Sequence, residues 1–315
     1  MDDQSQNIIL AQPRGFCAGV ERAVAMVESA LEIFDQPIYI RHEIVHNKSV
    51  IEDLTKKGAI FVEEIAEIPE GSITIFSAHG ISQKVYNDAV AKKLTIFDAT
   101  CPLVTKVHME VHKFAKDRRE CILIGHDNHP EVEGTLGQYD TSQGGKIYLI
   151  EDIQQAQTIQ VKNPEHLAYV TQTTLSYDDT EEIVQVLKER FPAIKEPYKN
   201  DICYATQNRQ NAVKQLVKDC QLVIVIGSSN SSNSNRLCEL AQKHGCSAYL
   251  IDDAAELQRE WIENVAGIGV TAGASAPEKL VVDVVNQLKA WGISQVVQAE
   301  GDKETVIFNL PPGMR

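Results

Sequence analysis

The feature of this sequence that most constrains its fold is a regular alternation of short apolar runs with longer amphipathic segments. The runs are rich in Ile, Val and Leu, as in LVIVI at 222–226, which is typical of strands buried on both faces. The segments between them repeat apolar residues at helical spacing. This alternation predicts an α/β fold with mainly parallel sheets. The predicted strands are 8–10, 38–40, 74–76, 95–97, 122–124, 147–150, 168–170, 222–226, 248–251 and 267–270.

The length of 315 residues is too great for one simple core and predicts two or three domains. A net charge of −14 argues against general binding to nucleic acid or to an anionic membrane surface. The apolar runs are too short to span a bilayer. The N-terminal MDDQSQN lacks the basic and apolar regions of a secretory signal, so we expect a cytoplasmic protein.

Three of the seven cysteines, Cys17, Cys101 and Cys203, come directly before predicted helices. Backbone N–H groups and the helix dipole favour a thiolate there. Pro102 is expected to begin the second of these helices, and Thr206 is expected to cap the third. The other four cysteines are interpreted as small apolar residues, and they are Cys121, Cys220, Cys238 and Cys246. An odd, widely spread set favours metal or catalytic use over a disulfide framework.

A positional repeat links the three cysteines to polar residues at strand ends. In two parts of the chain a cysteine is followed 28 residues later by one polar residue and 44 residues after that by another. These series are Cys101, His129 and Thr173, and Cys203, Ser231 and Ser275. From Cys17 the steps to His46 and His79 are 29 and 33 residues. Because ligands bind beyond the carboxyl ends of parallel strands, the repeat predicts three α/β units that face a common centre.

Three thiolates at one centre are compatible with several kinds of site. Structural zinc usually takes a local cysteine pair, and ferredoxin-type clusters take closely spaced cysteine runs, neither of which occurs here. A 4Fe–4S cluster with three protein ligands leaves one iron open as a Lewis acid while the cluster supplies electrons. We favour a cluster over zinc, and unrelated structural cysteines are the third interpretation.

Polar loops after two strands indicate a phosphate-bearing substrate. GSSNSSNSNR at 227–236 offers hydroxyl, amide and backbone N–H groups at the start of a helix, which is a favourable place for an anion. TAGASAP at 271–277 gives a weaker signal of the same kind. An ordinary polar turn is the simpler interpretation of either loop taken alone. The sequence lacks a Lys–Ser P-loop, which argues against nucleotide hydrolysis.

Histidines and carboxylates complete the candidate set. His46, His79 and His129 are candidate hydrogen-bond donors to phosphate, although a lone histidine is more often structural. In HPEVEG, Glu131 is a candidate proton donor, because burial raises the pKa of a carboxyl group. Glu133 competes for that role, and spacing does not separate the two.

Nine segments together resemble one enzyme family. They are PRGFCAGVERAV, HEIVHN, FSAHG, DATCPLVTKVH, GHDNHPEVEG, TQTTLS, DICYAT, NSSNSNRL and TAGASAP. The family is 4-hydroxy-3-methylbut-2-enyl diphosphate reductase, the last enzyme of the non-mevalonate isoprenoid pathway. The resemblance extends from about residue 8 to the C-terminal tail.

The resemblance implies three α/β lobes in a pseudo-threefold arrangement around a central 4Fe–4S cluster bound by Cys17, Cys101 and Cys203. We expect lobes at 1–101, 102–199 and 200–290 and a C-terminal tail at 291–315, with the N-terminal strand a candidate partner for the third lobe. The residues that the resemblance places around the substrate are His46, His79, His129, Thr173, Ser231, Ser232, Asn233 and Ser275.

The family reduces its allylic alcohol diphosphate with two electrons to isopentenyl and dimethylallyl diphosphate. By resemblance, the substrate hydroxyl binds the open iron, is protonated from Glu131 with help from His129 and Thr173, and is lost as water. Reduced flavodoxin or ferredoxin is the implied electron donor. The competing interpretations are a zinc hydrolase of a phosphorylated metabolite and a non-enzymatic redox sensor or electron carrier, and the second leaves the polar loops without a role.

Overall fold

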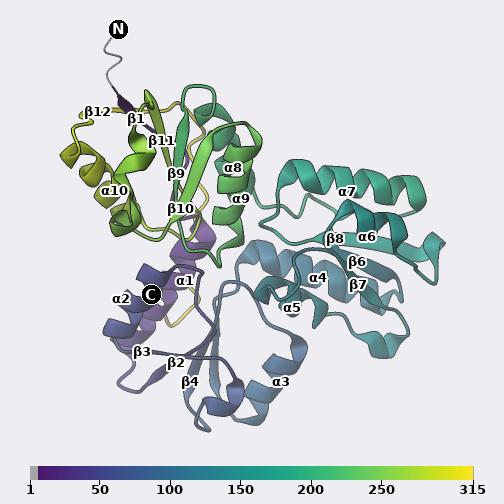
Figure 1. Ribbon diagram of the computed structural model, residues 1–315. Helices are drawn as coiled ribbons and strands as arrows, with labels where there is room; N and C mark the ends of the chain where they lie inside the picture. Colours follow the sequence, from purple (N-terminus) through teal and green to yellow (C-terminus); the bar gives the residue numbers. More distant parts are fainter. Residues whose placement is uncertain (1–5, 315) are drawn as a thin grey trace. The chain divides into compact units, whose positions relative to one another are not determined.

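The computed structural model describes residues 6–314, which form three parallel β-sheets with helices packed against them (Figure 1). The strands are β1 (Asn7–Leu10), β2 (Ile38–Arg41), β3 (Ala59–Val62), β4 (Ile73–Phe76), β5 (Thr95–Asp98), β6 (Glu120–Ile124), β7 (Ile147–Ile150), β8 (Leu167–Thr171), β9 (Leu222–Ile226), β10 (Ser247–Ile251), β11 (Gly267–Ala272) and β12 (Gln295–Gln298). The helices are α1 (Ala18–Ile33), α2 (Lys48–Lys56), α3 (Gln83–Ala91), α4 (Pro102–Lys116), α5 (Pro130–Leu136), α6 (Ile153–Thr158), α7 (Tyr177–Arg190), α8 (Tyr204–Leu216), α9 (Ser232–Lys243) and α10 (Glu278–Ala290).

The chain divides into two compact units. The first unit contains the residues up to Glu21, Val45–Asp53 and Tyr204–Ile307. The second unit contains Arg22–Ile44, Leu54–Cys203 and the residues from Phe308 onward. The unit boundaries fall inside α1 and α2 and so differ in kind from the predicted lobe boundaries at 101, 199 and 290. The three predicted lobes stay a prediction.

The first unit is built on a five-stranded sheet in the order β10-β9-β11-β1-β12. Alternate residues of β9 point to opposite faces. Leu222, Ile224 and Ile226 pack with the apolar side of α10, whereas Val223 and Val225 pack with α8 and α9. The strand is therefore apolar throughout because both faces are covered by helices, as Figure 1 shows for α10 and α9.

The second unit holds two smaller parallel sheets, with strand orders β3-β2-β4-β5 and β7-β6-β8. After Glu120, strand β6 is apolar for the same reason as β9. Its residues Ile122 and Ile124 face α7, and Cys121 and Leu123 face α4. The four-stranded sheet packs Phe76 of β4 against Ala89 of α3.

The prediction of an α/β fold with parallel sheets is confirmed, and all ten predicted strands are present. Pro102 begins α4, as expected. Thr206 lies inside α8 rather than before it, because the helix begins at Tyr204, directly after Cys203. Strands β3 and β12 were not predicted, and both lie at sheet edges. Strand β1 pairs with β11 on one side and β12 on the other.

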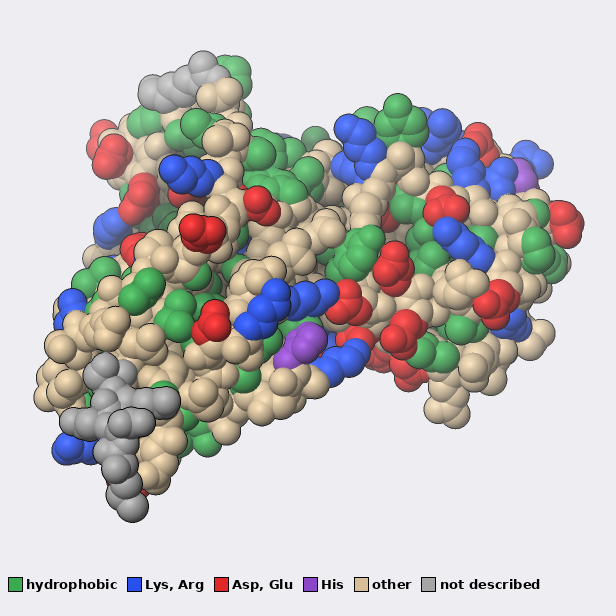
Figure 2. Space-filling model, turned by 90° about the horizontal axis from the view of Figure 1, so that it is seen from above, with side chains coloured by type: hydrophobic (Ala, Val, Ile, Leu, Met, Phe, Trp, Pro, Cys, Tyr) green, Lys and Arg blue, Asp and Glu red, His purple; other side chains and the backbone are tan. Residues whose placement is uncertain are grey.

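Among the described residues, none of the helices is both long enough and apolar enough to cross a bilayer. On the face of the molecule in Figure 2, Lys and Arg side chains lie among Asp and Glu side chains and do not form a separate basic region.

Candidate active site

The candidate residues lie in the loops that follow the carboxyl ends of parallel strands, or in the first turn of the next helix. In the second unit, His79 follows β4, Cys101 follows β5, His129 follows β6 and Thr173 follows β8. In the first unit the residues that follow β1, β9 and β11 are Cys17, Ser231 and Ser275. Strands in one parallel sheet end at the same edge, so each sheet gathers its own candidate residues at that edge.

Glu131 is a buried carboxyl group of the second unit. It lies in the first turn of α5 and is 3% exposed. Its Oε1 accepts the backbone N–H of Thr173 at 2.6 Å, and Oε2 accepts the Thr173 hydroxyl at 3.0 Å. Burial raises the pKa of Glu131 to about 7, and the hydrogen bonds from Thr173 oppose that rise. A carboxyl with this pKa exchanges a proton at neutral pH, which suits a general acid.

The two carboxylates of HPEVEG differ in burial because of the phase of α5. Glu131 points into the protein, whereas Glu133, two residues further along the helix, is exposed. His129 is the residue before α5, and its Nδ1 accepts the backbone N–H of Glu131 at 3.1 Å. The imidazole therefore caps the helix that carries the carboxyl group, and the two side chains are positioned together.

Thr173 also connects Glu131 to the cysteine loop. Its carbonyl oxygen accepts the backbone N–H of Cys203 at 3.1 Å. Two residues earlier, the backbone N–H of Thr171 donates to Oδ2 of Asp201 at 3.0 Å. Lys106 of α4 donates to the other oxygen of this wholly buried carboxylate at 2.8 Å. Burial raises the pKa of Asp201 to about 6, against the opposing effect of Lys106.

His79 reaches the same region from the neighbouring sheet. Its ring lies edge-on to that of His129, with 5.9 Å between the ring centroids. The loop that carries His79 makes close contact with α5, because a Cβ atom on Gly134 would lie 3.3 Å from the backbone of Gly80. The backbone N–H of Cys101 donates to the carbonyl of Ala78 at 3.0 Å. The second unit thus brings Cys101, Cys203, His79, His129, Glu131 and Thr173 into connected loops.

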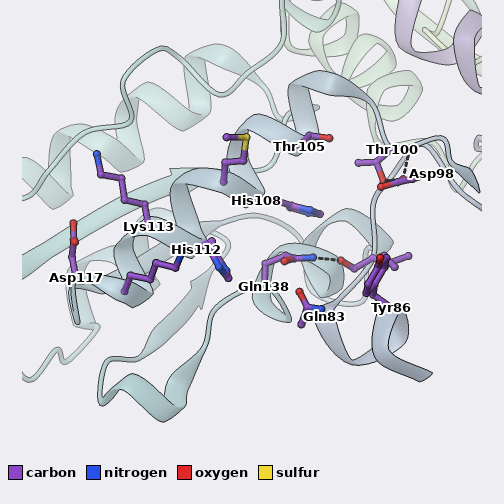
Figure 3. A pocket seen from close by; sticks show the side chains of 13 residues that line it. Gln83, Tyr86, Asp98, Thr100, Thr105, His108, His112, Lys113, Asp117 and Gln138 are labelled. Atoms are coloured by element: carbon purple, nitrogen blue, oxygen red, sulfur yellow. Dashed lines mark hydrogen bonds between the residues drawn. The ribbon is translucent and has the colours of Figure 1, made fainter. Parts of the chain in front are cut away.

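A pocket of about 610 Å³ lies beside this region, between α3, α4 and the end of α5 (Figure 3). His108, Lys113 and Gln138 line it, and it includes none of the candidate site residues. Burial lowers the pKa of His108 to about 4, so its imidazole is neutral at physiological pH. The ring packs against the His79 loop, since a Cβ atom on Gly80 would lie 2.5 Å from Cε1 of His108.

The first unit gathers hydroxyl and amide groups. Ser231 precedes α9, and its Oγ lies 3.0 Å from Oγ of Ser234 and 3.4 Å from Oγ of Ser275. Ser275 donates its hydroxyl to the carbonyl of His46 at 2.8 Å. Ser232 is the first residue of α9 and is half-buried. The group carries hydroxyls at a helix N-terminus, where a phosphate is favoured.

Asn233 links these residues to Cys17. Its Oδ1 accepts the backbone N–H of Ala274 at 3.0 Å, and the carbonyl of Ala274 accepts the N–H of Cys17 at 3.2 Å. Its Nδ2 is buried and has no hydrogen-bond partner within residues 6–314, so a donor is left for a ligand oxygen. Burial raises the pKa of Cys17, while the charge of Arg209 and the backbone N–H groups of Val20 and Gly19 oppose the rise.

The structure gives the positional repeat a physical basis. His129 and Ser231, each 28 residues after a cysteine, are the N-caps of α5 and α9. The strands before them, β6 and β9, pair directly with β8 and β11, whose loops carry Thr173 and Ser275. Equal spacing thus reflects the same α/β unit, in which a helix cap stands opposite the loop of the adjacent strand.

None of the seven cysteines forms a disulfide. Cys121, Cys220 and Cys246 are buried, and burial raises the pKa of Cys220 to about 12. Cys17 belongs to the first unit, and Cys101 and Cys203 belong to the second. Across the part of the chain that the structure describes, no three His, Cys, Asp or Glu side chains form a group that holds a metal ion.

Three buried polar residues near the site were missed by the sequence analysis: Asp201, Arg209 and Ser234. Arg209 occupies the apolar stripe of α8, three residues before Ala212, and a charge in such a stripe is the signal that would have identified it. Asp201 stands in the DICYAT segment, two residues before Cys203. Ser234 follows Ser231 and Ser232, which the sequence analysis did identify, in the same polar segment.

Comparisons with known proteins place the chain in a family. Residues 8–289 match the family described as LytB protein. The chain belongs to this family of reductases and is an oxidoreductase.

Two relatives are particularly informative. A protein of Pseudomonas entomophila named 4-hydroxy-3-methylbut-2-enyl diphosphate reductase is 60% identical over 308 residues, which cover 98% of both chains. The solved structure of the E-1-hydroxy-2-methyl-but-2-enyl-4-diphosphate reductase of Plasmodium falciparum is 40% identical, with a TM-score of 0.92 and coverage of 98% of this chain and 96% of that one. The resemblance noted from the nine sequence segments is thereby confirmed.

The pKa of Glu131 predicts how stability depends on pH. Since folding raises this pKa from 4.5 to about 7, the folded chain binds more protons than the unfolded chain between these values. The stabilisation is complete below the lower value and is lost as the pH rises through the upper one, at a cost of about 3 kcal/mol. The unfolding temperature of the parent should therefore fall relative to Glu131→Gln between about pH 5 and about pH 8.

The matched control is Glu133→Gln, which changes an exposed carboxyl group on the same helix and should follow the parent across this pH range. A difference between the parent and Glu131→Gln that stays constant with pH would contradict a raised pKa at Glu131.

Proposed function

We propose that this chain converts 4-hydroxy-3-methylbut-2-enyl diphosphate to isopentenyl and dimethylallyl diphosphate by two-electron reductive dehydroxylation. The observation that carries this proposal is the 60% identity, over 98% of both chains, to a protein named for that reductase. The overall reaction consumes two electrons and two protons, breaks the C–O bond of the alcohol, forms a C–H bond and releases water.

We propose Cys17, Cys101 and Cys203 as ligands of a 4Fe–4S cluster. The chemistry of these thiols supports the assignment, because each lies directly before or at the start of a helix, whereas three of the other four are buried as apolar residues. At Cys17 the backbone N–H groups of Gly19 and Val20 oppose the rise in pKa that burial causes, and thiolates are the ligands of such clusters. When bound, a cluster with three protein ligands supplies electrons one at a time and an open iron as Lewis acid.

The hydroxyl and amide groups of the first unit are proposed to bind the diphosphate. Ser231, Ser232, Asn233 and Ser275 offer neutral donors, and the unpartnered Nδ2 of Asn233 is already buried. His46 is proposed to contact the diphosphate beside them. In the second unit, His79, His129 and Thr173 are proposed to contact the substrate as well. Neutral donors bind the diphosphate without heavy salt-bridging, which is consistent with a chain of net charge −14.

Glu131 is proposed to supply the proton that the leaving hydroxyl takes up. The hydroxyl of Thr173 donates to Oε2 of Glu131 at 3.0 Å. When Glu131 is protonated, this hydrogen bond can reverse, so that Thr173 accepts the proton of Glu131 while it donates its own to the substrate oxygen. His129 positions Glu131, because Nδ1 of His129 accepts the hydrogen bond from the backbone N–H of Glu131. Hydroxide is a poor leaving group, and protonation lets it depart as water.

The proposed electron donor is reduced flavodoxin or reduced ferredoxin, and the proposed location is the cytoplasm. The donor is the one that the resemblance to the reductase family implies, and such carriers deliver electrons one at a time.

The first test is the metal content and products of the chain purified without oxygen. We expect about four iron and about four acid-labile sulfide per chain, and both isomeric diphosphates after incubation with substrate and a reductant. Electron paramagnetic resonance of the reduced protein should change when the allylic diphosphate is added. Stoichiometric zinc without iron would instead favour the hydrolase interpretation.

Glu131→Gln should keep the iron content and substrate binding of the parent but lose turnover by a factor of about 10² to 10⁴, because the amide cannot donate an acidic proton. Steady-state kinetics and a binding titration measure the two effects separately. Glu133→Gln should retain parental turnover. Full activity in Glu131→Gln would assign the proton to Glu133 or to solvent.

The double variant Ser231→Ala with Asn233→Ala should raise the apparent KM by about tenfold or more while changing kcat by less than about threefold, because ground-state binding of the diphosphate is lost. Ser229→Ala, an exposed serine of the same loop, is the control. Thermal unfolding shows whether loss of the α9 cap contributes. A fall in kcat at unchanged KM would count against a diphosphate-binding role.

A further inference from the structure

The C-terminal segment of the first unit runs alongside the chain that leads to Cys17. Strand β12 pairs in parallel with β1, and the backbone N–H of Ala299 continues the pairing to the carbonyl of Leu10 at 2.9 Å. Two residues later the segment makes a close approach to Gln12, because a Cβ atom on Gly301 would lie 1.9 Å from the carbonyl oxygen of Gln12. Only glycine fits at that position.

The same segment ends on a wholly buried arginine. Glu304 holds the guanidinium of Arg209 with two parallel contacts, Nη1 to Oε1 at 3.0 Å and Nη2 to Oε2 at 3.1 Å. Asn208 adds a bond to Oε1 at 3.2 Å. Such a bidentate pair fixes both position and orientation of the guanidinium.

Arg209 in turn binds the two carbonyl groups that directly precede Cys17. Its Nε and Nη2 donate to the carbonyl of Gly15 at 3.0 and 2.6 Å, and Nη2 also donates to that of Phe16 at 3.1 Å. Nη1 donates to the carbonyl of Ala205, one turn earlier in α8, at 2.9 Å. Each nitrogen of the guanidinium is therefore engaged, and the side chain is 0% exposed.

We propose that Arg209 and Glu304 are positioning residues for Cys17, and that residues 295–304 act as a strap that holds the Cys17 loop in place for metal binding. The metal-binding part rests on the proposed function, in which Cys17 is a cluster ligand. Neither residue is proposed to touch the cluster or the substrate.

The strap acts through electrostatics and geometry together. A buried guanidinium bound only to carbonyl groups would carry an uncompensated charge, and Glu304 supplies the compensation. Without the carboxylate, water must enter to solvate the guanidinium of Arg209. This water would replace the hydrogen bonds from Arg209 to the carbonyl groups of Gly15 and Phe16. The amide of Gly15, bonded to the carbonyl of Ala272, and the amide of Cys17 would then open more often.

The test compares the full chain, purified without oxygen, with Glu304→Gln and Arg209→Lys. Glu304→Gln keeps the shape of the side chain but removes its negative charge. Arg209→Lys keeps the positive charge but removes the planar guanidinium that makes the two contacts with Glu304. Asp302→Asn makes the same carboxylate-to-amide change at an exposed position two residues from Glu304 and is the matched control. Hydrogen–deuterium exchange of residues 11–17 and the rate of iron loss to a ferrous chelator are measured for each.

We expect exchange of the 11–17 amides to be about tenfold faster or more in Glu304→Gln and Arg209→Lys, and unchanged in Asp302→Asn. Exchange of Val223 and Val225 in β9 should be unchanged in all variants. Iron loss should be at least about threefold faster in the two variants that loosen the loop.

If residues 11–17 of Glu304→Gln exchange hydrogen as slowly as those of the parent, the strap proposal is overturned. It is also overturned if exchange in β9 becomes faster by the same factor, because that result indicates general destabilisation. Faster exchange with parental iron loss would overturn the link from the strap to metal binding. A parent that binds no iron would count against the proposed function instead, and the exchange of residues 11–17 would still decide whether the strap exists.

Discussion

The parallel arrangement of strands is the constraint on which the rest of this structure depends. Every pair in the three sheets is parallel, so all strands of one sheet end at one edge, and the chain must cross back to the opposite edge before each new strand, in most cases through a helix. The loops at the carboxyl edge are then free to carry chemistry, while the helices bury the apolar faces. Strand β9 illustrates the division, with five buried apolar residues followed directly by the Ser- and Asn-rich loop.

Much of this architecture could be predicted because the signals are local. A doubly covered strand such as 222–226 must be apolar on both faces, and Pro102 after Cys101 marks a helix start. Strands β3 and β12 escaped prediction because each is a sheet edge that leaves residues exposed, so its pattern is not continuously apolar. Thr206 was expected to cap α8, which in fact begins at Tyr204, because threonine is a favoured capping residue and Cys203, which directly precedes the helix, is not.

The residues of the candidate site likewise divide into those that local sequence signals predict and those that they do not. Residues that follow strands, such as His129 and Ser231, could be found from their spacing, since the α/β unit fixes the distance between a helix cap and the next loop. The burial of Glu131 and the exposure of Glu133 depend on the rotation of a short helix against its neighbours, which spacing does not encode. The partnership of Arg209 with Glu304 joins positions 95 residues apart, so no local pattern announces it.

The position of β1 has a consequence for the order in which the molecule can be completed during synthesis. Strand β1 is held between β11 and β12, and it leaves the ribosome roughly 250 residues before β11. At about 5–20 residues per second, β1 waits on the order of tens of seconds for its neighbours. The backbone partners of Gly15 and Cys17, Ala272 and Ala274, are translated equally late. Cys17 therefore acquires its native surroundings only late in synthesis, after the strands and loops that hold it have been made.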